Sequence, residues 1–120
     1  MALHAMKLHP APYEMIRAGQ KTIELRLYDE KRRLIQVGDM IRFENTQTGE
    51  KLTAAVTELY VFDSFEALYQ TLPLLECGYT AETVASARPE DMDAYYSKDA
   101  QRQCGVVGIK LKTAQVEGNP

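Results

Sequence analysis

The chain has 120 residues, 26% of them charged, with a formal net charge of −3 at pH 7, a size and composition typical of one globular domain. No apolar run approaches the roughly 20 residues that a membrane-spanning helix needs, and no signal-peptide pattern is visible at the N-terminus. We therefore expect a single cytoplasmic domain over residues 1–120 with no membrane partner. The acidic balance argues against a strong, non-specific binder of duplex nucleic acid.

The first third of the chain predicts two strands separated by a short helix. A strand at residues 5–9 ends at His9-Pro10-Ala11-Pro12, and proline is well suited to the first turn of the helix expected at 11–18. Gly19 is placed to end that helix, and a second strand follows at 21–28. Side chains alternate along a strand, so Ile23 and Leu25 share one face, whereas Glu24 and Arg26 share the other.

The remainder of the chain predicts three more strands and two more helices. After a charged turn at 29–33, the strands are expected at 40–44, 51–62 and 105–112, and the helices at 64–72 and 80–96, the second interrupted by Pro89. A change in apolar phase at Thr57-Glu58 indicates a β-bulge in the long strand. The polar tail at 114–120 is expected to fray.

This order of elements predicts an α+β fold, in which a meander of strands, broken by helices, forms a small closed or nearly closed barrel. Alternation within each strand predicts which apolar side chains face its interior. They are Ile23, Leu25, Ile41, Phe43, Val56, Val107 and Ile109.

The segment Gly19-Gln20-Lys21-Thr22-Ile23-Glu24-Leu25-Arg26 carries the strongest functional pattern. From its periodicity alone, the polar face with Glu24 and Arg26 is either a solvated, salt-bridged surface or a site. In a site, Arg26 is suited to hold a phosphate or carboxylate with two hydrogen bonds. Lys21 is suited to contact a phosphate or, if desolvated, to act as a base or nucleophile. Glu24 is suited to accept hydrogen bonds from a ligand or to orient Arg26.

The chain offers little for a metal site. Cys77 and Cys104 lie far apart in the sequence, and the two histidines are His4 and His9. Neither set has the spacing of zinc ligands. We expect no metal and no cofactor.

Several segments together resemble the ASCH domain, a relative of the PUA domain. They are Pro12-Tyr13, the Gly-x-Lys-x-x-Glu-x-Arg octet at 19–26, Val37 to Phe43, Tyr95 to Asp99, and Gly105 to Ile109. The resemblance spans roughly residues 6–112. It implies a small PUA-like β-barrel with flanking helices and a cleft for single-stranded RNA or a nucleoside or nucleotide. The implied ligand-binding residues are Lys21, Glu24 and Arg26, with Tyr96 and Ser97 across the cleft.

The resemblance also implies an alternative, a metal-independent hydrolase. One group within the family resembles amidohydrolases that act on N4-acetylcytidine through a lysine, a threonine and a glutamate, and other members resemble ribonucleases. Lys21 matches the lysine, Glu24 stands where that group has its threonine, and Glu76 is the candidate glutamate. Because of the change at position 24, the binding module is the preferred hypothesis, and the oligomeric state stays open.

Overall fold

The computed structural model describes residues 1–116, except for the side chains of residues 113–115. Its strands are β1 (Leu3–Leu8), β2 (Ile23–Leu27), β3 (Met40–Asn45), β4 (Lys51–Phe62) and β5 (Val106–Val116). The α-helices are α1 (Pro10–Arg17), α2 (Phe65–Thr71) and α3 (Lys98–Cys104). Short 3-10 helices are η1 (Arg32–Leu34), η2 (Leu74–Glu76), η3 (Val84–Ser86) and η4 (Pro89–Ala94). No helix in this part of the chain has the length and hydrophobicity of a membrane span.

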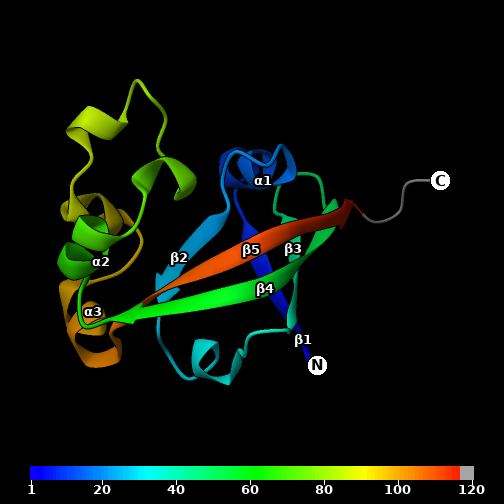
Figure 1. The fold of residues 1–120 in the computed structure, drawn as a ribbon, viewed down its shortest axis with the longest axis horizontal. Helices are drawn as coiled ribbons and strands as arrows, with labels where there is room; N and C mark the ends of the chain where they lie inside the picture. Colours follow the sequence, from blue (N-terminus) through cyan, green and yellow to red (C-terminus); the bar gives the residue numbers. More distant parts are fainter. Residues whose placement is uncertain (117–120) are drawn as a thin grey trace.

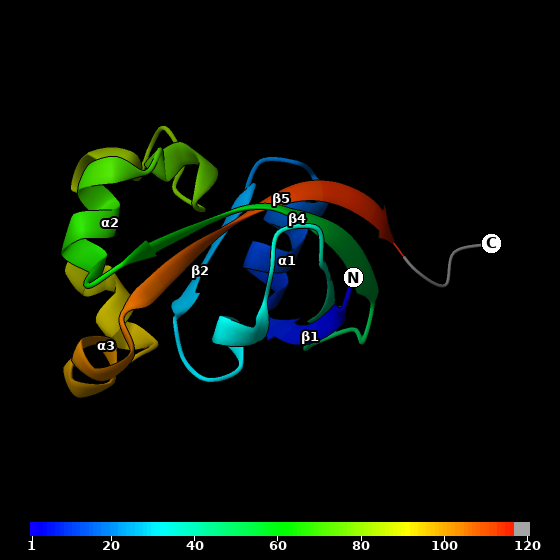
Figure 2. The same cartoon turned by 60° about the horizontal axis from the view of Figure 1, so that its bottom comes forward.

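The strands form one curled sheet in the order β1-β3-β4-β5-β2 (Figures 1 and 2). β1 pairs with β3 in parallel, and the other neighbours are antiparallel. The expected α+β, PUA-like class is confirmed, but the sheet forms a half-barrel with flanking helices and not the closed or nearly closed barrel expected from the sequence. The meander is wrong in one respect: β2 pairs with β5 and not with β1 or β3, so β1 and β2 form opposite edges of the sheet. The opening of the half-barrel therefore lies between β1 and β2.

Most strand predictions agree with the structure, including the irregularity in β4, whose register with β5 shifts between Val56 and Glu58. β5 runs to Val116, beyond the predicted end at 112, and the rest of the expected frayed tail, 117–120, lies outside the described residues. The helix expected at 80–96 is wrong. Thr83 and Asp91 side chains accept hydrogen bonds from the backbone N–H groups of Thr80 and Arg88, and such local bonds favour turns over an α-helix.

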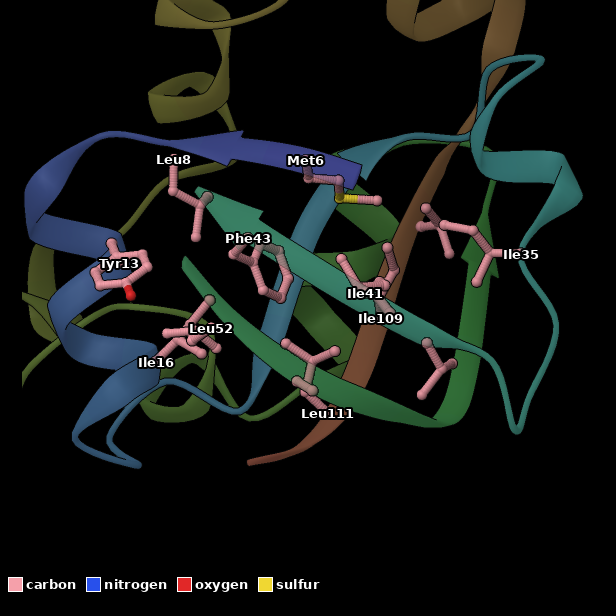
Figure 3. Packing of buried hydrophobic residues seen from close by; sticks show 13 residues of the cluster. Met6, Leu8, Tyr13, Ile16, Ile35, Ile41, Phe43, Leu52, Ile109 and Leu111 are labelled. Carbon is pink, nitrogen blue, oxygen red and sulfur yellow. The ribbon is translucent and has the colours of Figure 1, made fainter. Parts of the chain in front are cut away.

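One core fills the half-barrel (Figure 3). α1 covers one end of it and buries Tyr13 and Ile16, while β3 and β4 contribute Phe43 and Leu52. All these side chains are at most 1% exposed. Because α1 follows β1 directly, this packing fixes the junction of β1 and α1 next to the opening between β1 and β2.

A second core lies on the other face of β2 and corrects one sequence prediction. All seven residues expected inside the barrel are buried, but Ile23 and Leu25 pack with α2 residues such as Phe65 and Leu68 in this separate cluster. The pairing of Glu24 with Ile109 places Glu24 on the face of the barrel core. Alternation along β2 separates the two sets of side chains, but both faces of this strand are covered.

Gly108 on β5 allows the second core to form, because a Cβ atom there would lie 2.6 Å from Leu72 Cδ1 and 3.2 Å from Ile23 Cγ2. We expect Gly108→Ala to lower the free energy of unfolding by about 1–3 kcal/mol, the usual effect of overpacking. Urea denaturation measures this. Leu72→Ala makes room for the added methyl group, so the two substitutions combined should cost less than the sum of their separate effects. Strict additivity would contradict the contact.

Candidate functional site

A pocket of about 820 Å³ opens between β2, the β1–α1 junction and the segment from α2 to η4. This volume lies within the range of roughly 300–1,000 Å³ that small-molecule sites occupy. The wall includes the side chains of Lys21, Glu24, Arg26 and Tyr96, four of the residues singled out from the sequence. They come from two parts of the chain about seventy residues apart in sequence, so the fold is what brings them together.

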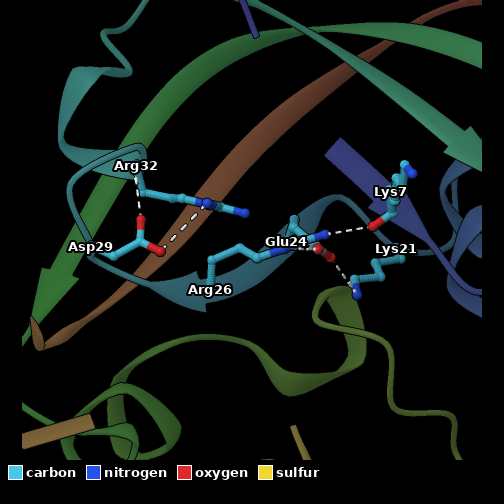
Figure 4. Close-up of polar contacts among 6 residues, drawn as sticks. All are labelled: Lys7, Lys21, Glu24, Arg26, Asp29 and Arg32. Carbon is cyan, nitrogen blue, oxygen red and sulfur yellow. Dashed lines mark hydrogen bonds and ion pairs between the residues drawn. The ribbon is translucent and has the colours of Figure 1, made fainter. Parts of the chain in front are cut away.

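Glu24 is the centre of a buried ion-pair network (Figure 4). Its Oε1 lies 2.8 Å from Lys21 Nζ, and its Oε2 lies 2.7 Å from Arg26 Nε. The side chains of Lys21, Glu24 and Arg26 are 11%, 4% and 15% exposed. One carboxylate thus holds two cations in fixed positions at the pocket wall, with an excess of positive charge.

The network also connects the two edges of the sheet. Arg26 on β2 donates from Nη2 to the carbonyl oxygen of Lys7 on β1 at 2.9 Å, and this contact is visible in Figure 4. On the other side, Gly78 has a φ of +112°, and the stem of Lys21 packs against it, with Lys21 Cδ 3.5 Å from where a Cβ would lie. A left-handed glycine therefore lets the loop pass close beside Lys21.

The electrostatics of the network follow from its burial. Burial alone would raise the pKa of Glu24, but the charges of Lys21 and Arg26 and their hydrogen bonds outweigh it, so the pKa lies below its usual value. Burial would likewise lower the pKa of Arg26, and the Glu24 charge reverses this and raises it. Glu24 is therefore a carboxylate at neutral pH, and Arg26 is a guanidinium.

Two neighbouring tyrosines line the same pocket in different ways. Tyr96 stacks on Phe65, with ring centroids 6.2 Å apart and an interplanar angle of 14°. Burial raises the pKa of Tyr96, while the nearby Arg26 opposes that shift. Tyr95 is 66% exposed and also lines the pocket. Both tyrosines therefore line the pocket, and Tyr95 presents the more exposed ring, whereas Tyr96, the ring expected from the sequence, already packs against Phe65.

Ser97 and Glu76 lie outside the pocket wall. The Ser97 hydroxyl oxygen accepts a hydrogen bond from Ala100 N and caps α3. Glu76 Oε1 accepts hydrogen bonds from Thr22 Oγ1 at 2.7 Å and Lys110 Nζ at 2.8 Å. Both side chains thus have hydrogen-bond partners outside the pocket wall. A capping pattern, serine before Lys98-Asp99, is the signal that could have identified the role of Ser97.

Other wall residues were not identified as site residues from the sequence. They include His9, Cys77, Tyr69, Tyr79 and Asp91. Burial raises the pKa of the Cys77 thiol to about 11, so this cysteine is a poor nucleophile at neutral pH. Within residues 1–116, no three His, Cys, Asp or Glu side chains lie close enough together to hold a metal ion.

Comparisons with known proteins identify the kind of domain. Residues 6–115 match the family model of the ASCH domain. The crystal structure of the hypothetical protein PH0355 is similar, with 30% identity and a TM-score of 0.75 over 95% of this chain and 100% of that one. The solution structure of PF0455 from Pyrococcus furiosus has 28% identity and a TM-score of 0.71 over 94% and 98%.

A third solved structure extends the comparison at the level of fold. The ASCH protein from Zymomonas mobilis has 15% identity and a TM-score of 0.66, covering 95% of this chain and 69% of that one. A search of curated protein sequences gives no significant match.

Proposed function

Because this chain belongs to the ASCH domain family, we propose that its pocket binds single-stranded RNA or a nucleoside or nucleotide. The observation that carries the proposal is the buried Lys21–Glu24–Arg26 network in the wall of a pocket that also presents an exposed tyrosine ring. Cations suit a phosphate group, and an exposed ring suits a base. A pocket and a single small group of cations favour unpaired nucleotides over a long duplex.

Charge distribution supports the preference for a small or single-stranded ligand. Eight acidic residues and one basic residue, Arg88, lie between positions 57 and 93, and this segment forms much of the pocket's second side. It repels the extended phosphate backbone of a duplex. We expect weak, salt-sensitive binding, because few phosphates are neutralised.

Tyr95 supplies the test of stacking. We expect Tyr95→Ala to weaken binding of cytidine 5′-monophosphate by roughly five-fold or more, since a base–aromatic stack contributes about 1–3 kcal/mol. Tyr95→Phe should retain most of the affinity, because the ring face is what the base contacts. Isothermal titration calorimetry measures both. If the phenylalanine and alanine variants lose equal affinity, the ring is not a stacking surface.

The hydrolase alternative depends on Lys21, which lies in the pocket wall 2.8 Å from Glu24. As a base or nucleophile, Lys21 must first release its proton, and Glu24 is the carboxylate in position to receive it. The lowered pKa of Glu24 makes it a poor acceptor, and Glu76 is paired elsewhere. These contacts support binding over catalysis.

We expect no turnover when the protein is incubated with N4-acetylcytidine or short single-stranded RNA. Chromatography of the products, with and without chelator, checks this. Turnover that survives chelator and is lost in a folded Lys21→Ala variant would instead support the metal-independent hydrolase. Turnover lost with chelator would contradict both readings.

A further inference from the structure

A chain of hydrogen bonds in another part of the pocket wall has no role in the network around Glu24. The hydroxyl groups of Tyr69 and Tyr79 lie 2.7 Å apart, and the Tyr79 hydroxyl lies 2.7 Å from Asp91 Oδ2. All three residues line the pocket. They come from α2, from the loop after η2 and from η4, so the tertiary fold assembles the chain.

The direction of each hydrogen bond in this chain follows from the chemistry of Asp91. Hydrogen bonds from the Tyr79 hydroxyl and from Arg88 N lower the pKa of Asp91, so its carboxylate only accepts. Tyr79 must then donate its single hydroxyl proton to Asp91. The Tyr79 oxygen then accepts a hydrogen bond from the Tyr69 hydroxyl. The Tyr69 proton is therefore also used within this chain of hydrogen bonds.

The side chains of Tyr69, Tyr79 and Asp91 therefore offer hydrogen-bond acceptors to the pocket and no free hydroxyl proton. Tyr79 and Arg88 both donate to Asp91 Oδ2. Among residues 1–116, no hydrogen bond to Asp91 Oδ1 is seen, so this oxygen is available to a ligand. The Tyr69 oxygen retains a lone pair. By contrast, the region of Lys21 and Arg26 offers donors and positive charge. The pocket is thus polarised between a donor region and an acceptor region.

We propose that the acceptor region formed by Tyr69, Tyr79 and Asp91 selects a nucleobase that carries an exocyclic amino group, cytosine or adenine, over uracil or hypoxanthine. This inference rests on the proposed function and names the ligand class for the same pocket. An amino group donates to the free acceptors. A carbonyl oxygen at the same position meets lone pairs and the charge of Asp91, so uracil or hypoxanthine must shift to present its ring N–H to these acceptors instead, which costs affinity.

The test compares matched nucleotide pairs by calorimetry. We expect cytidine 5′-monophosphate to bind about tenfold more tightly than uridine 5′-monophosphate, and adenosine 5′-monophosphate about tenfold more tightly than inosine 5′-monophosphate, the difference of one well-placed hydrogen bond to a charged group. Each pair carries the same phosphate and sugar, so the donor region contributes equally. Equal affinities within both pairs would overturn the inference while leaving nucleotide binding intact.

Two variants locate the selectivity in the acceptor region. Asp91→Asn supplies an amide donor, so it should bring the preference for amino-bearing bases close to one. Tyr79→Phe frees the Tyr69 proton to donate into the pocket but keeps the Asp91 carboxylate, so it should reduce the preference. Tyr28→Phe, which changes a tyrosine outside the pocket, should keep it. Thermal unfolding checks that each variant is folded. A preference that persists in both folded pocket variants would contradict the assignment, and absence of binding by all four nucleotides would overturn the proposed function itself.

Discussion

Replacing Glu24 by glutamine is expected to lower the free energy of unfolding by about 3–5 kcal/mol at neutral pH, the usual effect of removing one member of a buried ion pair. Glutamine has nearly the same shape, so the loss reflects charge. Lys21 and Arg26 would both remain in the pocket wall without their common counter-ion. Urea denaturation monitored by circular dichroism measures the change.

The difference in unfolding free energy between the wild type and Glu24→Gln should depend on pH. The pKa of Glu24 is lowered in the folded state, so its charge stabilises the fold fully above the usual glutamate pKa of about 4.3. The stabilisation is lost as the pH falls through the lower, folded-state pKa. The difference between the wild type and Glu24→Gln should therefore be largest at neutral pH and should shrink in acid.

Glu14→Gln is the matched control. Glu14 pairs with Arg17 on the surface of α1, where both side chains are about half exposed, at 49% and 47%. An exposed pair of this kind contributes little. If Glu14→Gln and Glu24→Gln destabilise the protein equally, the buried network is not a structural centre of the site.

Arg26→Ala is expected to weaken nucleotide binding by roughly tenfold or more, since hydrogen bonds to charged groups contribute about 1.5–3 kcal/mol. Arg26 uses Nε for Glu24 and Nη2 for Lys7, which leaves Nη1 for a phosphate group. Arg26→Lys keeps the charge but loses this forked geometry, so it should bind with intermediate affinity. Calorimetry with cytidine 5′-monophosphate measures each variant.

Arg102→Ala is the control for charge removal. Arg102 pairs with Asp99 on the exposed surface of α3 and lies outside the pocket wall. It should bind nucleotides like the wild type. Equal losses for Arg26→Ala and Arg102→Ala would show that binding follows overall charge and not the pocket. Thermal unfolding is measured in parallel, because Arg26 also connects the sheet edges.

Much of the fold follows from local patterns in the sequence. Alternation places the strands, and the change of phase at Thr57-Glu58 marks the β4 irregularity. The parallel pairing of β1 with β3 joins strands more than thirty residues apart in sequence, and no local pattern contains it. Alternation along β2 separates Glu24 from Leu25 but does not reveal which of these faces meets the barrel core.

The candidate site was predictable where its residues share one short strand. Glu24 and Arg26 are two residues apart on β2, so their proximity follows from strand geometry. Tyr69, Tyr79 and Asp91 lie on three elements whose contact depends on the tertiary fold. Ser97 as a ligand contact stays a prediction; the structure places it outside the pocket wall, where its hydroxyl oxygen caps α3.

Titration of isotope-labelled protein with cytidine 5′-monophosphate, followed through the backbone amide spectrum, shows whether a nucleotide binds in this pocket. We predict saturable shifts concentrated at the pocket, at Lys21, Arg26, Gly78 and Tyr95, with an affinity that falls as salt rises. A short single-stranded RNA should perturb the same amides. No saturable shifts with either ligand, or shifts confined to residues outside the pocket wall, would contradict the account.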